Sequence, residues 1–165
     1  MIKITSKEKD FLMNIADYKI LKIDQLAKLN HSGKGIVQRK VSKLYKNGLV
    51  NLAPRNFSLN FGRPENIISI SEKGVKLLQE ENLVDNKIPL ERFTTDKIYN
   101  IEHELLINWF RIHLQYIPEK VTDLTADFFP AITPFLPLKN NGQSLISEQF
   151  EFEKSRFEFI PDGVF

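Results

Sequence analysis

The apolar residues of the first 81 positions change their spacing twice, and this order restricts the fold more than any other feature of the chain. A spacing of three or four residues predicts helices at 5–18, 25–30 and 34–47, each with one apolar face. Alternation then predicts two strands, at 49–53 and 66–70, and a helical pattern returns at 71–80. The pattern therefore predicts three helices, a β-hairpin and a following helix, in that order.

Residues that favour helix ends stand at the borders of these segments. Thr5 and Glu8 have the spacing of a capping box, and Asp24 and Ser71 are expected to cap the second and fourth helices. Gly48 follows the third helix, where the chain needs a left-handed conformation that glycine adopts without strain. A turn at 31–35 separates the second helix from the third. Together these elements predict a winged helix-turn-helix domain at residues 1–81.

The remainder of the chain has a different pattern. Residues 82–97 are polar and are expected to form a linker to a C-terminal domain at 98–165. A longer helix is predicted at 98–117; its apolar residues fall on two stripes, so two sides need cover, from this chain or from a second copy. Phenylalanine alternates with polar residues at 150–153 and 157–159, which predicts a hairpin. The expected fold class is α+β, an N-terminal winged helix-turn-helix followed by a long helix and a Phe-rich antiparallel β segment.

Charge is distributed unevenly along the chain, although its net charge is only +2. Residues 1–55 carry 12 Lys or Arg and four Asp or Glu, a net charge of +8. The remaining residues carry 11 basic and 17 acidic side chains, a net charge of −6. A basic region on a nearly neutral chain is typical of a surface that contacts the phosphates of nucleic acid.

The third predicted helix carries the candidate DNA-binding surface. Val37, Val41 and Leu44 form its apolar face, and the opposite face has cations and amides but no acidic residue. Because opposite charges at i,i+4 stabilise a solvated helix, a face without acids suits a counter-charge supplied by DNA. Gln38 is suited to pair with adenine and Arg39 with guanine. The predicted DNA-binding residues are Ser32, Lys34, Gln38, Arg39, Ser42, Lys43, Lys46, Arg55, Asn56 and Arg63, the last three at the hairpin tip.

The composition excludes several kinds of site. The sequence has no cysteine, which removes disulfides, thiolate metal sites and cysteine nucleophiles. His31, His103 and His113 lack a spacing suited to one metal, and no phosphate-binding loop or hydrolase motif occurs. We therefore expect no metal, no cofactor and no enzymatic activity. No apolar run reaches the roughly 18 residues of a membrane span, so we expect a cytoplasmic protein without membrane contact.

Two groups of segments carry a resemblance to a known family. The first group is IDQLA at 23–27, VQRKVSKL at 37–44, GLV at 48–50, GRPE at 62–65 and ISEKG at 70–74. The second is HELLIN at 103–108, followed about fifty residues later by IPDGVF at 160–165. Together these segments resemble the replication-relaxation proteins of bacterial plasmids and other mobile elements.

The resemblance implies DNA binding in plasmid replication or transfer, and a C-terminal domain related to restriction nucleases. Family members continue beyond the strand that corresponds to IPDGVF at 160–165, so this chain is expected to be naturally short or trimmed. Asp162 would be one carboxylate of such a domain, but no downstream Glu-x-Lys is present to complete a nuclease site. No catalytic residue is therefore expected. His103 is expected to tie the long helix to the C-terminal sheet.

These observations predict duplex DNA binding by an accessory or initiator-like factor of plasmid or mobile-element replication or transfer. A transcriptional repressor that uses the same helix is the first alternative, and a protein-interaction module without DNA binding is the second. The expected partners are double-stranded DNA, replication or transfer proteins, and a second copy of the chain bound through residues 98–117. The DNA-binding prediction depends on the acid-free face being open to solvent, with its positive charge unmatched within the molecule.

Overall fold

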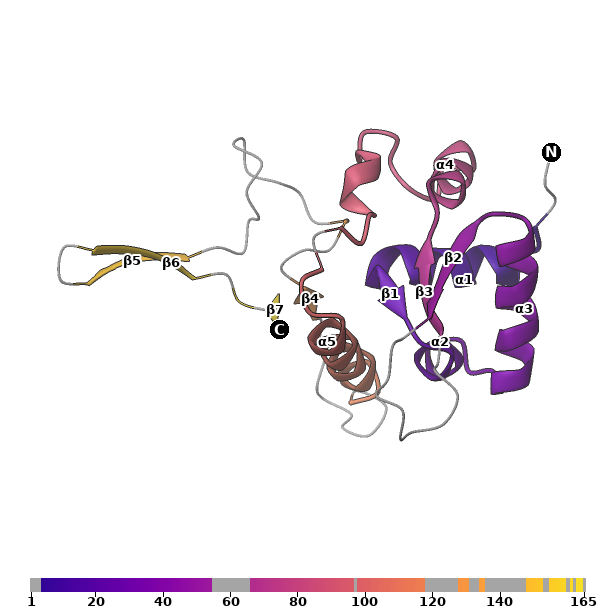
Figure 1. Ribbon diagram of the computed structural model, residues 1–165, viewed down its shortest axis with the longest axis horizontal. Coiled ribbons are helices and arrows are strands. Elements are labelled where there is room, and N and C mark those ends of the chain that lie inside the picture. The colour runs from indigo at the N-terminus through magenta and orange to yellow at the C-terminus, as the bar shows by residue number, and fades with distance from the viewer. Residues whose placement is uncertain are drawn as a thin grey trace. The chain divides into compact units, whose positions relative to one another are not determined.

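The computed structural model begins with three helices, α1 (Ser6–Tyr18), α2 (Ile23–Leu29) and α3 (Lys34–Lys46), as Figure 1 shows. The predicted capping box at the start of α1 is confirmed. The Thr5 N–H donates to Glu8 Oε2 at 2.8 Å, and the Glu8 N–H donates to Thr5 Oγ1 at 3.3 Å. Gly48, just after α3, has a φ of +69°, which confirms the predicted left-handed residue.

A three-stranded antiparallel sheet lies beside these helices. It consists of β1 (Ile20–Leu21), β2 (Val50–Pro54) and β3 (Asn66–Ile70), in the order β1-β3-β2. The register runs from Val50 opposite Ile70 to Pro54 opposite Asn66. Helix α4 (Glu72–Glu80) follows, and the Ser71 hydroxyl accepts from the Gly74 N–H at 3.0 Å, as expected of a cap. The element order α1-β1-α2-α3-β2-β3-α4 is that of a winged helix-turn-helix.

The start of α2 differs from its prediction. The helix begins at Ile23, so Asp24 lies in its first turn, and the expectation that Asp24 is the cap was wrong. Instead the Lys22 N–H donates to Gln25 Oε1 at 2.9 Å, which satisfies one of the free amides at this helix end. The Asp24 carboxylate accepts from the ammonium of Lys34 at 2.7 Å, because α2 and α3 meet at the turn between them.

One hydrophobic core joins these helices and the sheet. Each element supplies at least one side chain with less than 2% of its surface exposed. They include Leu12 and Ile15 of α1, Leu26 of α2, Val37 and Leu44 of α3, Ile68 of β3, and Leu78 of α4. Burial of each such side chain contributes about 1.5–3 kcal/mol, so the inward face of α3 is fixed by the core.

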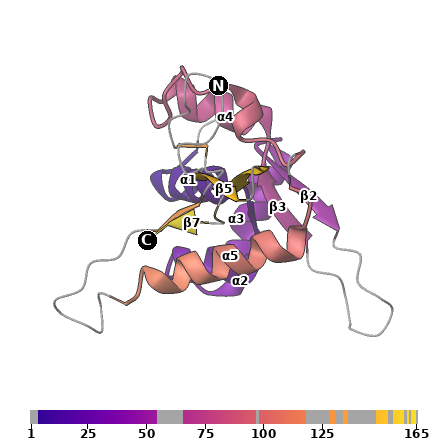
Figure 2. The same ribbon diagram turned by 90° about the vertical axis from the view of Figure 1, so that its left-hand side faces the viewer.

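The segment after α4 leads to one further long helix. It contains a 3₁₀ turn, η1 (Leu90–Arg92), and its Val84 and Phe93 are buried. Helix α5 (Ile101–Leu114) lies within the range 98–117 in which a helix is predicted, and in Figure 2 it runs beside α2. Leu105 of α5 joins Ile20 and Ile67 of the sheet in a buried cluster.

Polar contacts also attach α5 to the sheet and to the first helices. The buried Asn108 donates its amide to two carbonyls, of Tyr18 at 3.1 Å and Ile20 at 2.8 Å. Gln25 of α2, also buried, donates to the Leu105 carbonyl at 2.8 Å. The Arg111 guanidinium pairs with Asp17 and lies 3.9 Å from the centre of the Tyr18 ring. These contacts make α5 part of the same unit as the winged helix.

The chain divides into two compact units, Met1–Ile112 and His113–Phe165. The structure describes residues 4–54, 66–96, 98–117, 128–130, 134–135, 148–152, 155–159, 161 and 163–164. In the second unit β4 (Phe129–Pro130) pairs antiparallel with β7 (Gly163–Val164), and β5 (Glu148–Phe152) pairs antiparallel with β6 (Ser155–Phe159). The predicted domain limits after residues 81 and 97 stay predictions, whereas α5 up to Ile112 belongs to the first unit.

Candidate nucleic-acid interface

Helix α3 presents one face to the core and the rest of its circumference to solvent. Val37, Val41 and Leu44 are buried, as their spacing predicts. Every other residue of α3 is exposed except Lys40, which is half-buried. Figure 1 shows α3 at one side of the unit, with no other labelled element of that unit beyond it. The DNA-binding prediction requires this face to be open to solvent, and within the first unit it is.

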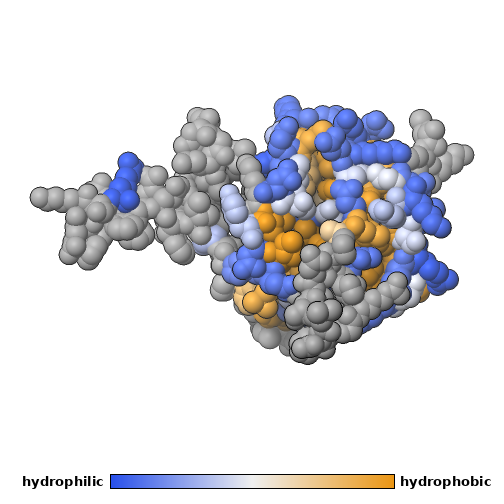
Figure 3. Space-filling model, in the orientation of Figure 1, coloured by the Kyte–Doolittle hydropathy of each residue, from blue (hydrophilic) through white to orange (hydrophobic). Residues whose placement is uncertain are grey.

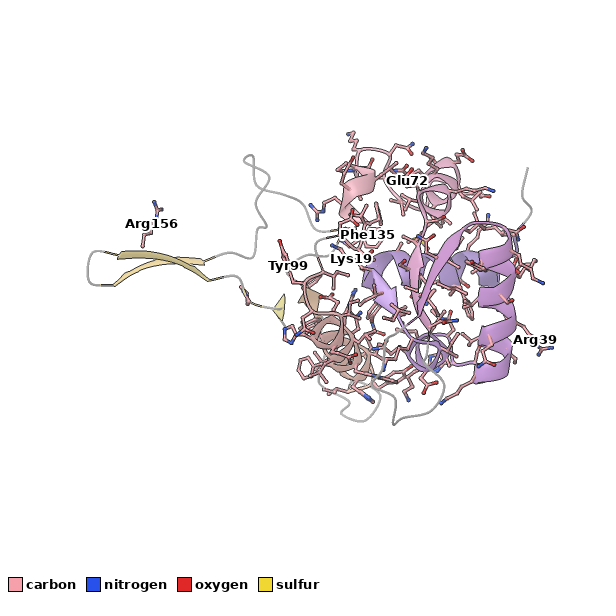
Figure 4. All side chains as sticks on the ribbon, viewed as in Figure 1. Lys19, Arg39, Glu72, Tyr99, Phe135 and Arg156 are labelled. Atoms are coloured by element: carbon pink, nitrogen blue, oxygen red, sulfur yellow. The ribbon has the colours of Figure 1, made fainter. Side chains whose placement is uncertain are left out.

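Four residues form the line along α3 that lies farthest from the core. They are spaced four, three and four positions apart, which places them on one side of the helix, opposite its buried residues. This outer line consists of Gly35, Arg39, Ser42 and Lys46. Arg39 points away from the unit in Figure 4, and its Nε donates to the Gly35 carbonyl at 3.4 Å. Hydrophilic residues predominate on this side of the unit in Figure 3. Gln38 is exposed beside the outer line.

Lys43 is not a free cation, contrary to the expected unmatched charge. Its ammonium donates to Glu8 Oε1 at 2.7 Å, and the Glu8 side chain is only 4% exposed, whereas that of Lys43 is 52% exposed. Burial raises the pKa of the Glu8 carboxyl, but hydrogen bonds from Lys43 and Thr5 lower it further, so its pKa lies below the ordinary value of 4.5. Glu8 is therefore ionised at neutral pH and balances one charge of α3.

The remaining predicted residues near the turn have partners too. The Lys34 ammonium pairs with Asp24, as described above, and the Ser32 hydroxyl donates to the Asn30 carbonyl at 2.9 Å. Lys40 lies with its ammonium 5.6 Å from the centre of the Phe11 ring of α1. Part of the positive charge of α3 is thus engaged at its flanks. No described residue forms an ion pair with Lys46 or Arg39, and both belong to the outer line.

The structure brings seven of the ten predicted residues onto α3 and the turn before it. The other three, Arg55, Asn56 and Arg63, lie outside the described residues, although the strands β2 and β3 that would carry them are described. The antiparallel pairing of these strands ends at Pro54 and Asn66, as a hairpin between them requires. Their part in the candidate site stays a prediction.

Two features of this surface were not predicted from the sequence. Glu8 was expected only as a capping residue, although its spacing from Phe11 and Ile15 places it on the inward side of α1. Ile36 was not singled out, yet it is 45% exposed in the first turn of α3. Its position outside the apolar spacing of Val37 and Val41 is the signal that would have identified it.

Helix α5 has a buried and an exposed apolar side. Leu105 and Ile112 are buried, whereas Leu106 is 67% exposed and Phe110, four residues farther on, is 50% exposed. Exposed apolar residues are what the predicted homodimer requires, and that prediction remains untested. His103 lies on α5 and is exposed, and its predicted contact with the C-terminal sheet also stays a prediction.

The described residues offer little for other chemistry. Within the described ranges, no group of three or more His, Asp or Glu side chains could hold a metal ion. Asp162, the candidate nuclease carboxylate, lies outside them. None of the described helices combines the length and the apolar composition needed to cross a bilayer.

The structure is similar to solved structures of MarR-family regulators. It matches wild-type apo MarR from E. coli with 18% identity and a TM-score of 0.43, covering 72% of this chain and 78% of that chain. It matches a MarR-family transcriptional regulator from Silicibacter pomeroyi DSS with 18% identity and a TM-score of 0.43, covering 71% and 72%. A likeness of this degree assigns no function, and the winged-helix fold rests on the element order above.

Neither a family model nor a curated protein matches the sequence. Membership of the replication-relaxation family therefore gains no support from these comparisons, whereas the winged helix-turn-helix on which the resemblance partly rests is present.

Proposed function

We propose that the chain binds duplex DNA through the outer face of α3 and regulates transcription. The outer face is the exposed side of the helix that carries the outer line and Gln38. The observation that supports this most is the make-up of that face. Among the exposed residues of α3 there is no acid, and Arg39 and Lys46 on its outer line have no ionic partner among the described residues. An α-helix fits the major groove, which is about 12 Å wide, and the 13 residues of α3 span about 20 Å.

The positions on α3 suggest a division of tasks. Gln38 and Arg39 lie in its N-terminal half, the part of a recognition helix that contacts base edges. Lys46 lies in the last turn, and in this proposal it contacts a phosphate. To bind a phosphate, Lys34 must leave Asp24 and Lys43 must leave Glu8. We therefore expect each of these lysines to contribute less to the affinity than Lys46 does. Arg55, Asn56 and Arg63 would contact the DNA backbone from the hairpin tip.

A regulatory role in transcription requires nothing beyond duplex binding at a suitable site. A bound protein excludes other proteins from the same DNA, so the outer face of α3 is sufficient for repression. A role as an accessory or initiator-like factor in replication or transfer needs further protein partners. That alternative is favoured by the segment at 103–108, which lies on α5, the long helix that the resemblance expects.

We also propose that two copies associate through α5. Leu106 and Phe110, four residues apart, leave apolar surface exposed on a helix whose other side is fixed by Asn108 and by the hydrogen bond from Gln25. Two linked copies of α3 would contact two half-sites and so extend the bound sequence. Replacement of Leu106 by Glu should lower the mass in solution, measured by light scattering, while the circular dichroism spectrum stays that of the folded protein. A mass independent of this substitution would contradict the dimer.

The salt dependence of binding tests the DNA proposal. Each neutralised phosphate contributes about −0.9 to the slope of log affinity against log salt on duplex DNA. Lys46, Arg55 and Arg63 alone predict a slope of about −2.7, and with Lys34 and Lys43 the slope is about −4.5. Absence of binding to any duplex at low salt would contradict the proposal and favour a protein-interaction module.

The DNA sites that the protein selects distinguish the two roles. Duplexes bound from a random pool would be sequenced and located on the source replicon. Sites at promoters are expected if the protein regulates transcription. Recovery only at an origin of replication or transfer would contradict that role and support the alternative.

A further inference from the structure

An apolar side chain borders the outer line of α3. Ile36 is 45% exposed in the first turn of α3. It lies three residues before Arg39, so the two side chains are neighbours on the helix surface, with Ile36 on the flank that also carries Lys40 and Lys43. Ile36 is not among the buried residues of the core, which holds Val37 on the inward side of the same turn.

The glycine beside Ile36 is not explained by the fold. Gly48 needs its positive φ, and a Cβ on Gly74 would lie 2.2 Å from the Leu49 carbonyl oxygen, so both of these positions require glycine. A Cβ on Gly35 would meet no described atom within 4 Å, and its φ is not positive. Glycine is less favourable than alanine inside a helix. Because Gly35 has no side chain, a ligand that approaches the helix from outside can come close to its backbone.

The major groove has one apolar group among its base edges. Guanine, adenine and cytosine present hydrogen-bond donors or acceptors there, and thymine adds a C5-methyl group. Ile36 can satisfy no donor or acceptor, so contact with those polar groups would remove their water without replacing it. The thymine methyl is the group that gains from contact with an aliphatic side chain.

We propose that the first turn of α3 recognises thymine in the major groove, with Ile36 packed on the C5-methyl group and Gly35 permitting close approach of the helix backbone. This inference rests on the proposed DNA binding. It places an A·T pair beside the base pair that Arg39 contacts, because Ile36 and Arg39 lie one turn apart. Sequence preference thus arises from an apolar contact as well as from hydrogen bonds.

Uracil substitution tests the methyl contact. A duplex selected from a random pool is prepared with each thymine replaced in turn by deoxyuridine, which keeps the base pair and removes the methyl group. At one position the substitution should raise the Kd of the wild-type protein about fourfold, the value expected for one buried methyl group. A selected site without thymine, or equal affinity for every uracil duplex, would overturn the inference while DNA binding itself stands.

Variants connect that position to Ile36. Ile36→Ala should bind the thymine and uracil duplexes equally, whereas Leu83→Ala, a matched change at a 40% exposed leucine outside α3, should keep the fourfold difference. If Ile36→Ala keeps the difference, the methyl group contacts another residue and the inference is wrong. If the wild-type protein binds no duplex at all, the proposed function and this inference both fail.

Gly35→Ala tests the close approach separately. Because a Cβ at this position has open space in the fold, the urea midpoint should stay the same or rise. Affinity for the thymine duplex should fall, since the added methyl group separates the helix from the bases. Unchanged affinity together with an unchanged or higher midpoint would overturn the assignment of Gly35.

Discussion

The carboxylate of Glu8 at the start of α1 and the ammonium of Lys43 in the second half of α3 lie 2.7 Å apart. The second oxygen of Glu8 accepts from the Thr5 N–H at 2.8 Å, so one buried side chain both caps α1 and holds α3. The pair fixes the flank of α3 that faces α1, together with the contact of Lys40 with the Phe11 ring. The ion pair also occupies Lys43, which was predicted from the sequence to bind DNA.

Replacement of Lys43 by Met should destabilise the protein at neutral pH. The substitution leaves the buried Glu8 carboxylate without its charged donor, and hydrogen bonds to charged groups contribute about 1.5–3 kcal/mol. Because Lys43 is half exposed, we expect a loss of about 1 kcal/mol in the free energy of unfolding. Urea unfolding, followed by circular dichroism, measures it as a lower midpoint at constant m.

Lys46→Met is the matched control for that experiment. Lys46 lies three residues farther along α3, is exposed, and has no ion pair with a described residue. Its replacement should change the free energy of unfolding by less than about 0.5 kcal/mol. Equal midpoints for the two variants would show that the Glu8–Lys43 pair contributes no stability in solution.

The same pair predicts how stability depends on pH. The pKa of Glu8 is lower in the folded protein than its ordinary value of 4.5, so the carboxylate stabilises the fold above pH 4.5. This contribution is lost as the pH falls below 4.5 and through the folded pKa. The difference in free energy of unfolding between wild type and Glu8→Gln should therefore be largest near neutral pH and shrink in acid. Urea titrations from about pH 7 to about pH 3 measure it. A difference that grows in acid would contradict the sign of the shift.

Replacement of Asn108 by Leu should loosen α5 from the winged helix. Leucine has a similar size but no donor, so the carbonyls of Tyr18 and Ile20 would lose the amide that satisfies them. A buried polar group left without a partner costs about 1–3 kcal/mol, and we expect a loss of at least about 2 kcal/mol for the two carbonyls together. Hydrogen exchange of the α5 amides and urea unfolding measure it. Leu83→Ala, at a 40% exposed position outside α5, should leave the exchange of the α5 amides nearly unchanged.

Local features of the fold were predictable because they depend on neighbours in sequence. The buried face of α3 follows from the spacing of Val37, Val41 and Leu44, and Gly48 and Ser71 mark helix ends through their own chemistry. The order of these elements then limits the fold to a winged helix-turn-helix. The tip of the hairpin and the domain limits stay predictions.

The pairing of charges was not predictable, because it depends on how the helices pack. Asp24 was predicted to cap a helix, but because α3 packs against α2, its carboxylate forms an ion pair with Lys34. Glu8 and Lys43 are far apart in sequence and meet only when α1 and α3 share the core. Gln25 and the Leu105 carbonyl are 80 residues apart. Asn108 gave a partial signal, since a polar residue between Leu105 and Ile112 interrupts an apolar stripe.

Gln38 and Lys46 should affect DNA binding in different ways if the outer face of α3 enters the major groove. Gln38→Ala removes a side chain suited to adenine and should reduce the preference for the selected site over variants changed at one base pair by about 1–3 kcal/mol. Lys46→Ala removes a phosphate contact, so it should weaken binding to all duplexes alike and make the salt slope less steep by about 0.9. Fluorescence anisotropy with the selected site, its single-base variants and an unrelated duplex, at several salt concentrations, separates the two effects. If Lys46→Ala changed base preference while Gln38→Ala lowered all affinities equally, α3 would lie in the groove with a different side toward the bases.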